Sequence, residues 1–345
     1  MSISVLQEAP LWVNGVVFIA AAAVVWLAGT RLTHVLDAIS LKTGLGQAFV
    51  GMLLLGGITS LPEVANVLTA STRGVPELAI NNLLGSAAIN ILLLAIVDAV
   101  IGRKALTSVV AEPATMMMCA LCILVLCVVA IAVTVGDVAV FGVGVWSVII
   151  CTISIGSFAL ATTYDKRAPW RLKDDAEQED AGTAHAPKTS LKRLILVAAV
   201  TGALIFAAGY TLSEVGDTLA EQTGLGAGFV GFLLIGLATS MPELSSITAA
   251  IRLRRYEMAF GQVLGTNFVN LALILLADVV YRGGPVISQL GDFEIVSALL
   301  GLVLIGVFHL GLLERRNPVV LRAGYDSVAV MVLFLGGVGL LYAIR

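Results

Sequence analysis

The chain has 345 residues, of which 59% are hydrophobic and only 12% are charged, and its formal net charge is −3. A soluble domain carries roughly 25% charged residues, so the composition excludes an ordinary soluble protein. Apolar runs of about 20 residues recur along the chain, which is the length that a helix needs to cross a bilayer. The first ten residues contain no Lys or Arg, so we expect no secretory signal.

Ten apolar windows predict an all-α polytopic membrane protein with ten transmembrane helices. The windows cover about 11–34, 47–72, 76–101, 111–134, 138–163, 191–213, 227–251, 256–281, 293–313 and 323–344. Residues 164–190 are hydrophilic, mixed in charge and rich in Ala, Pro and Gly, which is typical of a solvated linker. We therefore expect a first five-helix repeat at 1–163, this linker, and a second five-helix repeat at 191–345.

The Lys and Arg residues gather on one side of the predicted helices. Of the 20 in the chain, only Arg73, Arg282 and Arg345 fall on the side that does not hold the linker. Positive residues beside membrane spans mark the cytoplasmic face. We therefore expect an integral protein of the plasma (inner) membrane, with the linker in the cytoplasm and both termini outside.

An offset of 180 residues relates the two halves. TGLGQAFVG at 43–51 recurs as TGLGAGFVG at 223–231, and GGITSLPEVANV at 56–67 recurs as GLATSMPELSSI at 236–247. Each half holds five spans, an odd number, so the second copy enters the membrane upside down relative to the first. Inverted repeats with interrupted helices are a signature of secondary transporters, whose substrate site lies near the midplane.

The longer repeated stretch places a proline inside a membrane span in each half. Pro62 lacks an N–H, so the carbonyl of Ile58 loses its helical partner, and Pro242 does the same to Ala238. Irregular backbone at this depth survives only when it is buried in protein or faces a wet cavity. Each stretch is therefore predicted to hold a broken helix with carbonyl oxygens available at the break.

One residue after each proline comes a glutamate, Glu63 or Glu243, in a span whose interior has no Lys or Arg. An ionised carboxylate at the centre of a membrane helix costs on the order of 3 kcal/mol. Two carboxylates in register at one site therefore require a cation. Hydroxyls of the same stretches would supply further oxygens: Thr59, Ser60, Thr239 and Ser240.

The span after each stretch carries polar side chains four residues apart, which places them on one helix face. They are Asn82, Ser86 and Asn90 in the first repeat and Gln262, Thr266 and Asn270 in the second, with Asn267 one step off the stripe. Gly85 and Gly265 allow the helices to approach closely. Oxygen donors without His or Cys favour hard ions such as Ca²⁺, Na⁺ or Mg²⁺ over zinc or copper.

The paired motifs G-x-x-[TS]-S-x-P-E and G-[ST]-x-x-x-N, each present twice, resemble the alpha repeats of the sodium/calcium exchanger family, within the calcium/cation antiporter superfamily. The resemblance covers both halves and implies ten transmembrane helices, alternating access and Na⁺-driven exchange of Ca²⁺. Asn270 stands where several members carry Asp, which leaves two carboxylates at the site instead of three. The cation ligands that the resemblance implies are Thr59, Ser60, Glu63, Ser86, Asn90, Thr239, Ser240, Glu243, Thr266 and Asn270, with backbone carbonyls near Gly56 and Gly236.

The residues themselves leave alternatives open. Two glutamates can exchange a divalent ion (Ca²⁺, Mg²⁺ or Mn²⁺) for protons as readily as for Na⁺, and the same oxygens could line a cation channel. An enzyme is not expected, because the sequence offers no nucleophile–base pair or metal triad. We expect no resident cofactor and no nucleic-acid partner; the partners are the transported ions and the bilayer.

Two groups of polar residues also have structural interpretations. Asn90 and Asn270 could join helices by hydrogen bonds, and Asn82, Gln262 and Asn267 could support the ion ligands from behind. Asp98 and Asp278 lie near predicted span ends, where we expect them to be solvated.

Overall fold

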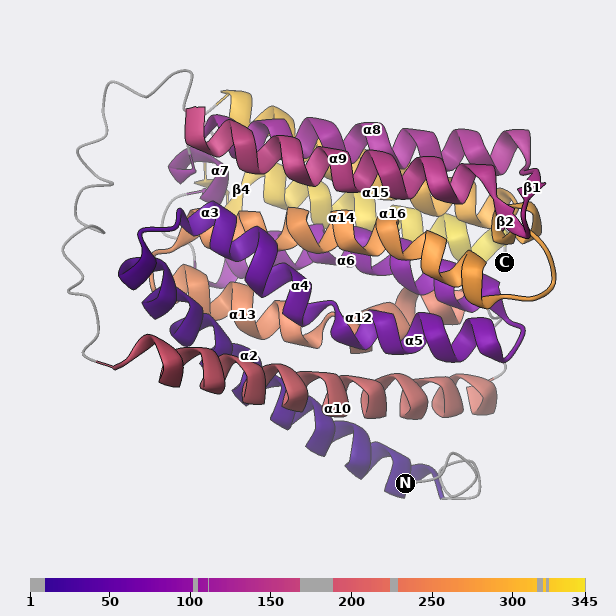
Figure 1. Cartoon of the computed structure of the whole chain (residues 1–345), viewed down its shortest axis with the longest axis horizontal. Coiled ribbons are helices and arrows are strands. Elements are labelled where there is room, and N and C mark those ends of the chain that lie inside the picture. The colour runs from indigo at the N-terminus through magenta and orange to yellow at the C-terminus, as the bar shows by residue number, and fades with distance from the viewer. Residues whose placement is uncertain are drawn as a thin grey trace.

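The computed structural model describes residues 10–101, 105–110, 112–167, 189–223, 229–314, 319–320 and 323–344. It is a bundle of helices that run along one common direction (Figure 1). The first half contains α2 (Leu11–Thr43), α3 (Gln47–Phe49), η1 (Val50–Leu55), α4 (Gly56–Thr59), α5 (Leu61–Thr72), α6 (Pro76–Ile101), α7 (Leu106–Val109), α8 (Pro113–Val135), β1 (Ala139–Val140), β2 (Val143–Gly144) and α9 (Val145–Arg167). The second half contains α10 (Leu191–Thr223), η4 (Val230–Ile235), α12 (Gly236–Thr239), α13 (Met241–Arg252), α14 (Tyr256–Val280), η5 (Val286–Gln289), α15 (Asp292–Glu314), β3 (Val319–Val320), β4 (Ala323–Gly324) and α16 (Tyr325–Ile344).

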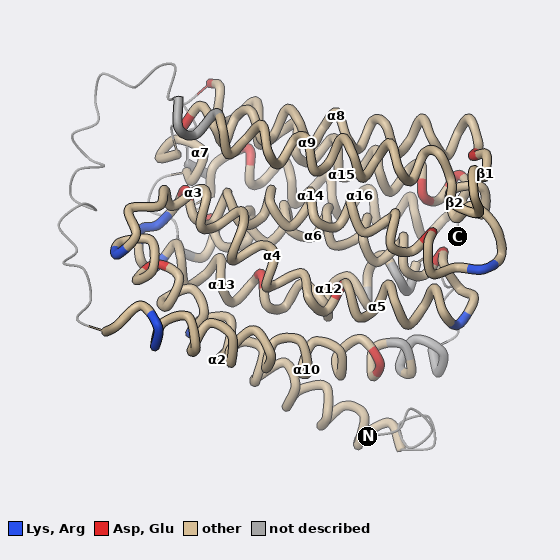
Figure 2. Tube along the Cα trace, viewed as in Figure 1, with Lys and Arg blue, Asp and Glu red and all other residues tan. Residues whose placement is uncertain are grey.

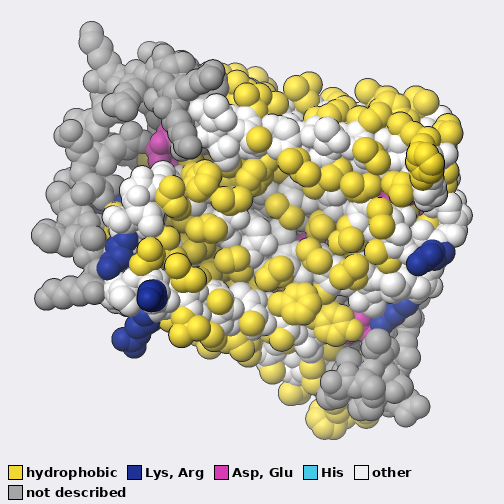
Figure 3. Space-filling view, in the orientation of Figure 1, with side chains coloured by type: hydrophobic (Ala, Val, Ile, Leu, Met, Phe, Trp, Pro, Cys, Tyr) yellow, Lys and Arg dark blue, Asp and Glu magenta, His cyan; other side chains and the backbone are white. Residues whose placement is uncertain are grey.

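The described helices confirm an all-α membrane protein. Nine of them are long and apolar enough to cross a bilayer, and the tenth predicted span, 227–251, corresponds to η4, α12 and α13, with its first two residues outside the described chain. On the face of the bundle that Figure 3 shows, side chains are mostly hydrophobic between the two ends. Lys and Arg lie at the ends (Figure 2). A helix satisfies its own backbone hydrogen bonds, which is why apolar segments of this length take that form in lipid.

The two halves have the same fold in opposite orientations. In Figure 1 the chain enters α2 at the right end of the bundle and enters α10 at the left end. The packing is exchanged between halves: α2 contacts α13 and α10 contacts α5, while α14 contacts α9 and α6 contacts α16. Elements on the symmetry axis contact their own counterparts, α2 with α10 and α8 with α15. This arrangement is an inverted repeat, as the odd number of spans predicts.

The predicted close approach at Gly85 and Gly265 is confirmed. A Cβ atom at Gly85 would collide with the carbonyl of Phe232 in η4, and one at Gly265 would collide with the carbonyl of Met52 in η1. Met52 and Phe232 are themselves 180 positions apart. The two glycines therefore let each broken helix lie against the polar helix of the opposite repeat.

The prediction that Asp98 and Asp278 are solvated is wrong, because they are 0% and 1% exposed. Asp98 accepts hydrogen bonds from the N–H groups of Leu106 at 3.0 Å and Gly324 at 2.9 Å. Asp278 accepts from the N–H groups of Val286 and Gly144, both at 2.6 Å. Each carboxylate thus holds the end of its helix to a β-hairpin of the other repeat, and backbone donors replace the water that it loses.

Several boundaries differ from the hydropathy windows. Helices α2 and α10 continue to Thr43 and Thr223, because their last two turns are helical but too polar for an apolar window to include. The window at 138–163 begins in the β1–β2 hairpin, and α9 starts only at Val145. Most of the predicted linker lies at 168–188, outside the described residues, so the proposed domain boundaries remain a prediction.

Replacing Gly85 by Ala should destabilise the protein by about 1–3 kcal/mol, since the new methyl group meets a backbone carbonyl that cannot rotate away. The measurement is the midpoint of thermal unfolding in detergent. Gly156→Ala is the matched control, because a Cβ at Gly156 meets nothing within 4 Å. Equal midpoints for the two variants would contradict the close approach.

Candidate cation site

Both broken helices are interrupted at one serine. Ser60 has φ −77° and ψ 1°, and Ser240 has φ −83° and ψ 5°, which is well away from the helical ψ of about −42°. A new helix then starts at Leu61 and at Met241, each with the predicted proline in its first turn. The predicted breaks at Pro62 and Pro242 are therefore present, although each is only one residue wide.

A six-residue π-helical segment precedes each break, η1 in the first repeat and η4 in the second. The sequence analysis missed these segments. A π-turn widens the backbone by one residue, and such turns occur frequently at functional sites. Gly56 and Gly236 follow these segments, and a Cβ atom at either position would crowd α14 or α6. The π-helical segments and the two glycines together bring the broken helices close to the polar stripes.

The ten side chains predicted as cation ligands are all buried, each at most 1% exposed. The two repeats cross at the breaks: the Thr239 hydroxyl lies beside the Glu63 carboxylate, and the Thr59 hydroxyl lies beside that of Glu243. The two carboxylates are close enough to interact electrostatically. Glu63 and Glu243 therefore meet at one place in the bundle, as the inverted repeat predicts.

The oxygens of these glutamates have little protein to bind. Glu63 Oε1 accepts from the Ser86 hydroxyl at 3.4 Å, but Glu63 Oε2 and both carboxylate oxygens of Glu243 are buried with no donor within hydrogen-bond distance. The Thr59 hydroxyl beside Glu243 donates instead to the Leu55 carbonyl at 2.9 Å. Within the described residues no Lys or Arg forms an ion pair with either glutamate. Buried polar atoms are normally satisfied, so three orphaned carboxylate oxygens at one point indicate a place for a cation.

Hydroxyl groups of both repeats meet beside the glutamates. Ser86 Oγ lies 3.2 Å from Thr239 Oγ1, and Thr239 donates to Asn82 Oδ1 at 3.1 Å. The Gly56 carbonyl accepts hydrogen bonds from the Ser60 N–H and hydroxyl, at 3.1 and 2.8 Å. In the second repeat the equivalent hydroxyl, that of Ser240, is buried without a hydrogen-bond partner.

The asparagines on the polar stripes are not equivalent. Asn90 donates to Asn267 Oδ1 at 3.2 Å across the two repeats, while its own Oδ1 has no partner. Both amide atoms of Asn270 are buried without a hydrogen bond. Asn90 therefore joins two helices and still has a free oxygen that could bind an ion. Asn270 makes no hydrogen bond within the protein that would give it a structural role.

A second row of polar residues supports the first, and the sequence analysis named only half of it. Asn82 donates to Asn66 Oδ1 at 3.1 Å, and Gln262 donates to the Ser246 hydroxyl. Positions 66 and 246 differ by the repeat offset of 180. In the second repeat the longer side chain of Gln262 reaches the shorter side chain of Ser246, so both pairs span the same gap between helices. Asn66 and Ser246 could have been predicted from the sequence, because both are polar residues in an apolar span and they are 180 positions apart.

In the described chain, no three His, Cys, Asp or Glu side chains come together as a metal site. The candidate site therefore rests on two carboxylates with hydroxyl, amide and carbonyl oxygens. Hard cations such as Ca²⁺ and Na⁺ prefer oxygen ligands of this kind.

The family model described as "Sodium/calcium exchanger protein" matches residues 13–165 and 193–342. The chain belongs to the sodium/calcium exchanger family. The chain is similar to CaxA of Alkalimonas amylolytica, a protein named provisionally as an antiporter, with 22% identity over 95% of this chain and 98% of that one. It is also 22% identical to the inner membrane protein YrbG of Escherichia coli K12, over 84% of this chain and 85% of YrbG.

Among solved structures, the exchanger fold is shared with NCX_Mj, a sodium-calcium exchanger. One structure of NCX_Mj soaked with Na⁺ and Sr²⁺ superposes with a TM-score of 0.69 at 16% identity, and it covers 94% of this chain and 97% of that one. At this identity the likeness shows the fold. Family membership makes the protein a cation antiporter, as the paired motifs predicted.

The difference between Asn90 and Asn270 can be measured. Asn270→Leu should leave the thermal midpoint in EDTA unchanged or higher, because it removes buried polar atoms that have no partner. Asn90→Leu should lower stability by about 1 kcal/mol, because it breaks the bond to Asn267. We expect Asn270→Leu to reduce the stabilisation that added Ca²⁺ gives. A loss of stability in Asn270→Leu as large as in Asn90→Leu would contradict a ligand role.

Proposed function

We propose that the protein exports Ca²⁺ from the cytoplasm in exchange for external Na⁺, using one site between Glu63 and Glu243. The observation that carries the proposal is the group of three buried carboxylate oxygens without hydrogen-bond donors. Charges of this kind inside a membrane are expensive unless a cation neutralises them. Family membership and the oxygen-only chemistry of the surrounding side chains support Ca²⁺ and Na⁺ as the ions.

Coupling follows from the charge of the site. One Ca²⁺ balances two carboxylates, and Na⁺ ions bound to the same oxygens balance them when Ca²⁺ leaves. The unneutralised pair of glutamates would resist the change between outward and inward access, because a net charge would then be carried through low dielectric. Each Thr lies beside the glutamate of the other repeat, so an ion at this point would contact both repeats at once.

The proposed direction of transport depends on orientation. Arg73 follows α5 and Arg282 follows α14, whereas the other described Lys and Arg residues lie in the second half of α2, at the end of α9, at the start of α10 and around the end of α13. Figure 2 shows more basic residues toward one end of the bundle than toward the other. By the positive-inside rule, the richer end faces the cytoplasm and both termini face outward. The name of YrbG places that relative in an inner membrane, and we propose the plasma (inner) membrane for this chain too.

A second candidate keeps the site and changes the coupling ion. Two neighbouring glutamates can release protons when a divalent cation binds, so H⁺ could replace Na⁺ as the counter-ion for Ca²⁺, Mg²⁺ or Mn²⁺. The absence of a third carboxylate at the site favours neither ion. A cation channel is a third candidate, and it would show conductance far above the turnover of a transporter.

We expect Glu63→Gln and Glu243→Gln each to reduce Ca²⁺ uptake into Na⁺-loaded proteoliposomes about 10- to 100-fold, because each variant keeps the side-chain shape and removes one charge of the site. Glu77→Gln is the matched control, since Glu77 is an exposed carboxylate at the start of α6. Uptake at the normal rate in both site variants would refute the two-glutamate site.

The coupling ion is tested with Na⁺, H⁺ and K⁺ gradients imposed separately on the same proteoliposomes. We expect an outward Na⁺ gradient to drive Ca²⁺ uptake and the other two gradients to have little effect. Uptake that follows a pH gradient without Na⁺ would reject Na⁺ coupling and support the H⁺-coupled candidate.

A further inference from the structure

The β1–β2 hairpin joins α8 to α9 and carries exposed apolar side chains. Phe141 at its tip is 103% exposed, Val138 is 70% exposed and Val140 is 50% exposed. Every residue from 138 to 145 is Val, Ala, Phe or Gly. Figure 1 shows the hairpin at the right end of the bundle, where α8 ends and α9 begins. The bundle therefore ends in an exposed apolar turn at this point.

The tip residue also has an unfavourable backbone conformation. Val140 pairs with Val143 across the two strands. Phe141 and Gly142 therefore form a two-residue turn, with φ of 53° and 84°. Such a turn favours Asn, Asp or Gly at its first position, because both residues need positive φ, and a bulky side chain there is strained. A small polar residue at position 141 would remove the strain and the apolar exposure together, so the phenylalanine indicates an apolar contact outside the chain.

The base of the hairpin is held by hydrogen bonds to other elements. Asp137 Oδ1 accepts from the Trp146 N–H at 3.1 Å, and the Ser288 hydroxyl of η5 donates to the Asp137 carbonyl at 3.2 Å. Asp278, in the last turn of α14, accepts from the Gly144 N–H at 2.6 Å. These bonds join the hairpin to η5 and α14, so they hold its tip in one position relative to the bundle.

The equivalent hairpin of the second repeat has a different composition. The positions 180 residues after the turn hold Leu321 and Arg322, which lie outside the described residues, and Arg315 and Arg316 precede them in the sequence. Residues 135–145 contain no Lys or Arg, and their one charged residue is Asp137 in the hairpin base. The repeat therefore does not require an apolar hairpin, and the apolar composition belongs to one end of the bundle.

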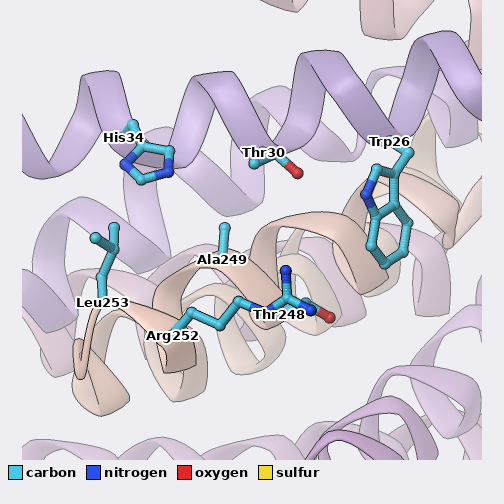
Figure 4. Close-up of a pocket in the computed structure, with 7 residues that line it drawn as sticks. All are labelled: Trp26, Thr30, His34, Thr248, Ala249, Arg252 and Leu253. Carbon is cyan, nitrogen blue, oxygen red and sulfur yellow. The ribbon is translucent and has the colours of Figure 1, made fainter. Parts of the chain in front are cut away.

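The opposite end of the bundle presents charged and polar side chains to its surroundings. A groove of about 160 Å³ lies there between α2 and α13 (Figure 4). Arg252 and His34 line this groove, and both are exposed. Long basic side chains at a membrane surface extend toward water and headgroups. That end therefore meets the membrane surface through polar groups, whereas the β1–β2 hairpin offers only apolar side chains at its tip.

The backbone and the side chains of the hairpin together indicate which layer of the bilayer they contact. Each strand of a two-stranded sheet has an outer edge whose N–H and C=O groups have no ladder partner, and such groups are not exposed to lipid within the hydrocarbon core. Apolar side chains, in turn, are unfavourable in water. The headgroup layer satisfies both, because water and headgroups can bond to the backbone while apolar side chains reach the acyl chains.

The hairpin is also continuous with the lipid-facing surface of the two helices that it joins. Ile131 and Val135 on α8 are 51% and 70% exposed, and Val148 on α9 is 45% exposed. Both helices are long and apolar enough to cross the bilayer, so these side chains contact acyl chains. The hairpin extends the same apolar surface to the headgroup layer.

We propose that the tip of the β1–β2 hairpin inserts into the headgroup layer of the adjacent lipid leaflet, with Phe141 as the anchor and Val138 and Val140 beside it. In the proposed orientation this is the outer leaflet. Because Asp278 bonds to the hairpin base, the anchor is connected to α14, the helix that carries two of the candidate ion ligands. The inference does not depend on which ions the protein exchanges.

The test uses the full chain with its four tryptophans replaced by phenylalanine and one reporter introduced by Phe141→Trp. The protein is placed in nanodiscs that hold one copy each, with phosphatidylcholine brominated either near the headgroup or near the end of the acyl chains. Gln289→Trp is the matched control, because Gln289 is an exposed polar residue of η5 at the same end of the bundle. We expect bromines near the headgroup to quench Phe141→Trp more strongly than Gln289→Trp, and soluble acrylamide to quench it less.

Two results of this experiment would overturn the proposal. Equal quenching of the two variants, by lipid and by acrylamide alike, would place the tip of the hairpin in water. Stronger quenching of Phe141→Trp by bromines at the end of the acyl chains than by those near the headgroup would place the tip in the hydrocarbon core instead of the headgroup layer.

A second measurement keeps the native tryptophans, and it serves if the tryptophan-free chain fails to fold. The four cysteines are replaced by alanine, Phe141→Cys or Gln289→Cys is introduced, and the rate of labelling by a soluble maleimide is measured in the same nanodiscs. We expect Phe141→Cys to react about tenfold more slowly than Gln289→Cys, because lipid covers the side chain for most of the time. Equal rates would contradict the proposal. Protection of Phe141→Cys that requires several copies in one nanodisc would identify a second copy of the chain as the contact, and the assignment to lipid would be wrong.

Discussion

The structure depends on keeping two carboxylates, Glu63 and Glu243, together and away from water inside a membrane. Neither has a basic partner within the described residues, and three of their four oxygens have no donor. Protein alone leaves this arrangement unfavourable, since mutual repulsion adds to the cost of desolvation. The hydroxyls beside the carboxylates reduce that cost without removing it. Under the proposed function, an ion that can also leave completes the balance, which is the physical requirement for a transporter.

The same close contacts between helices occur once in each repeat and make this arrangement possible. Gly85 and Gly265 let the broken helices reach the polar helices of the opposite repeat, and Asp98 and Asp278 fasten the ends of those polar helices to hairpins of the other half. These contacts all cross from one repeat to the other. Neither half can therefore form its part of the site alone, and a small movement between halves changes the distance between the glutamates.

Much of the fold and of the candidate site was predictable, because the two halves of the sequence can be compared with each other. Hydropathy predicted the spans, and the odd number of spans in each half predicted the inversion. The offset between Pro62 and Pro242 then predicted the meeting of the glutamates. The burial of Asp98 was not predictable, because Gly324 is 226 positions away. Its nearer partner, Leu106, donates through a backbone N–H, which no side chain in the sequence marks. The support of Asn82 by Asn66 was missed for a related reason: a hydrogen bond between two helices depends on their relative rotation, which hydropathy does not determine.

The places where the repeats differ are as informative as those where they agree. Perfect inverted symmetry would make the two ends of the bundle chemically identical, but they face different solutions and different lipid leaflets. Arg73 pairs with Glu214 between α5 and α10, whereas the positions related to them by the repeat offset hold Leu253 and His34. The ion pair is therefore present at one end of the bundle, although α2 packs against α13 as α10 packs against α5. The positions that agree bring the two glutamates together, and the positions that differ make the two ends of the bundle chemically distinct.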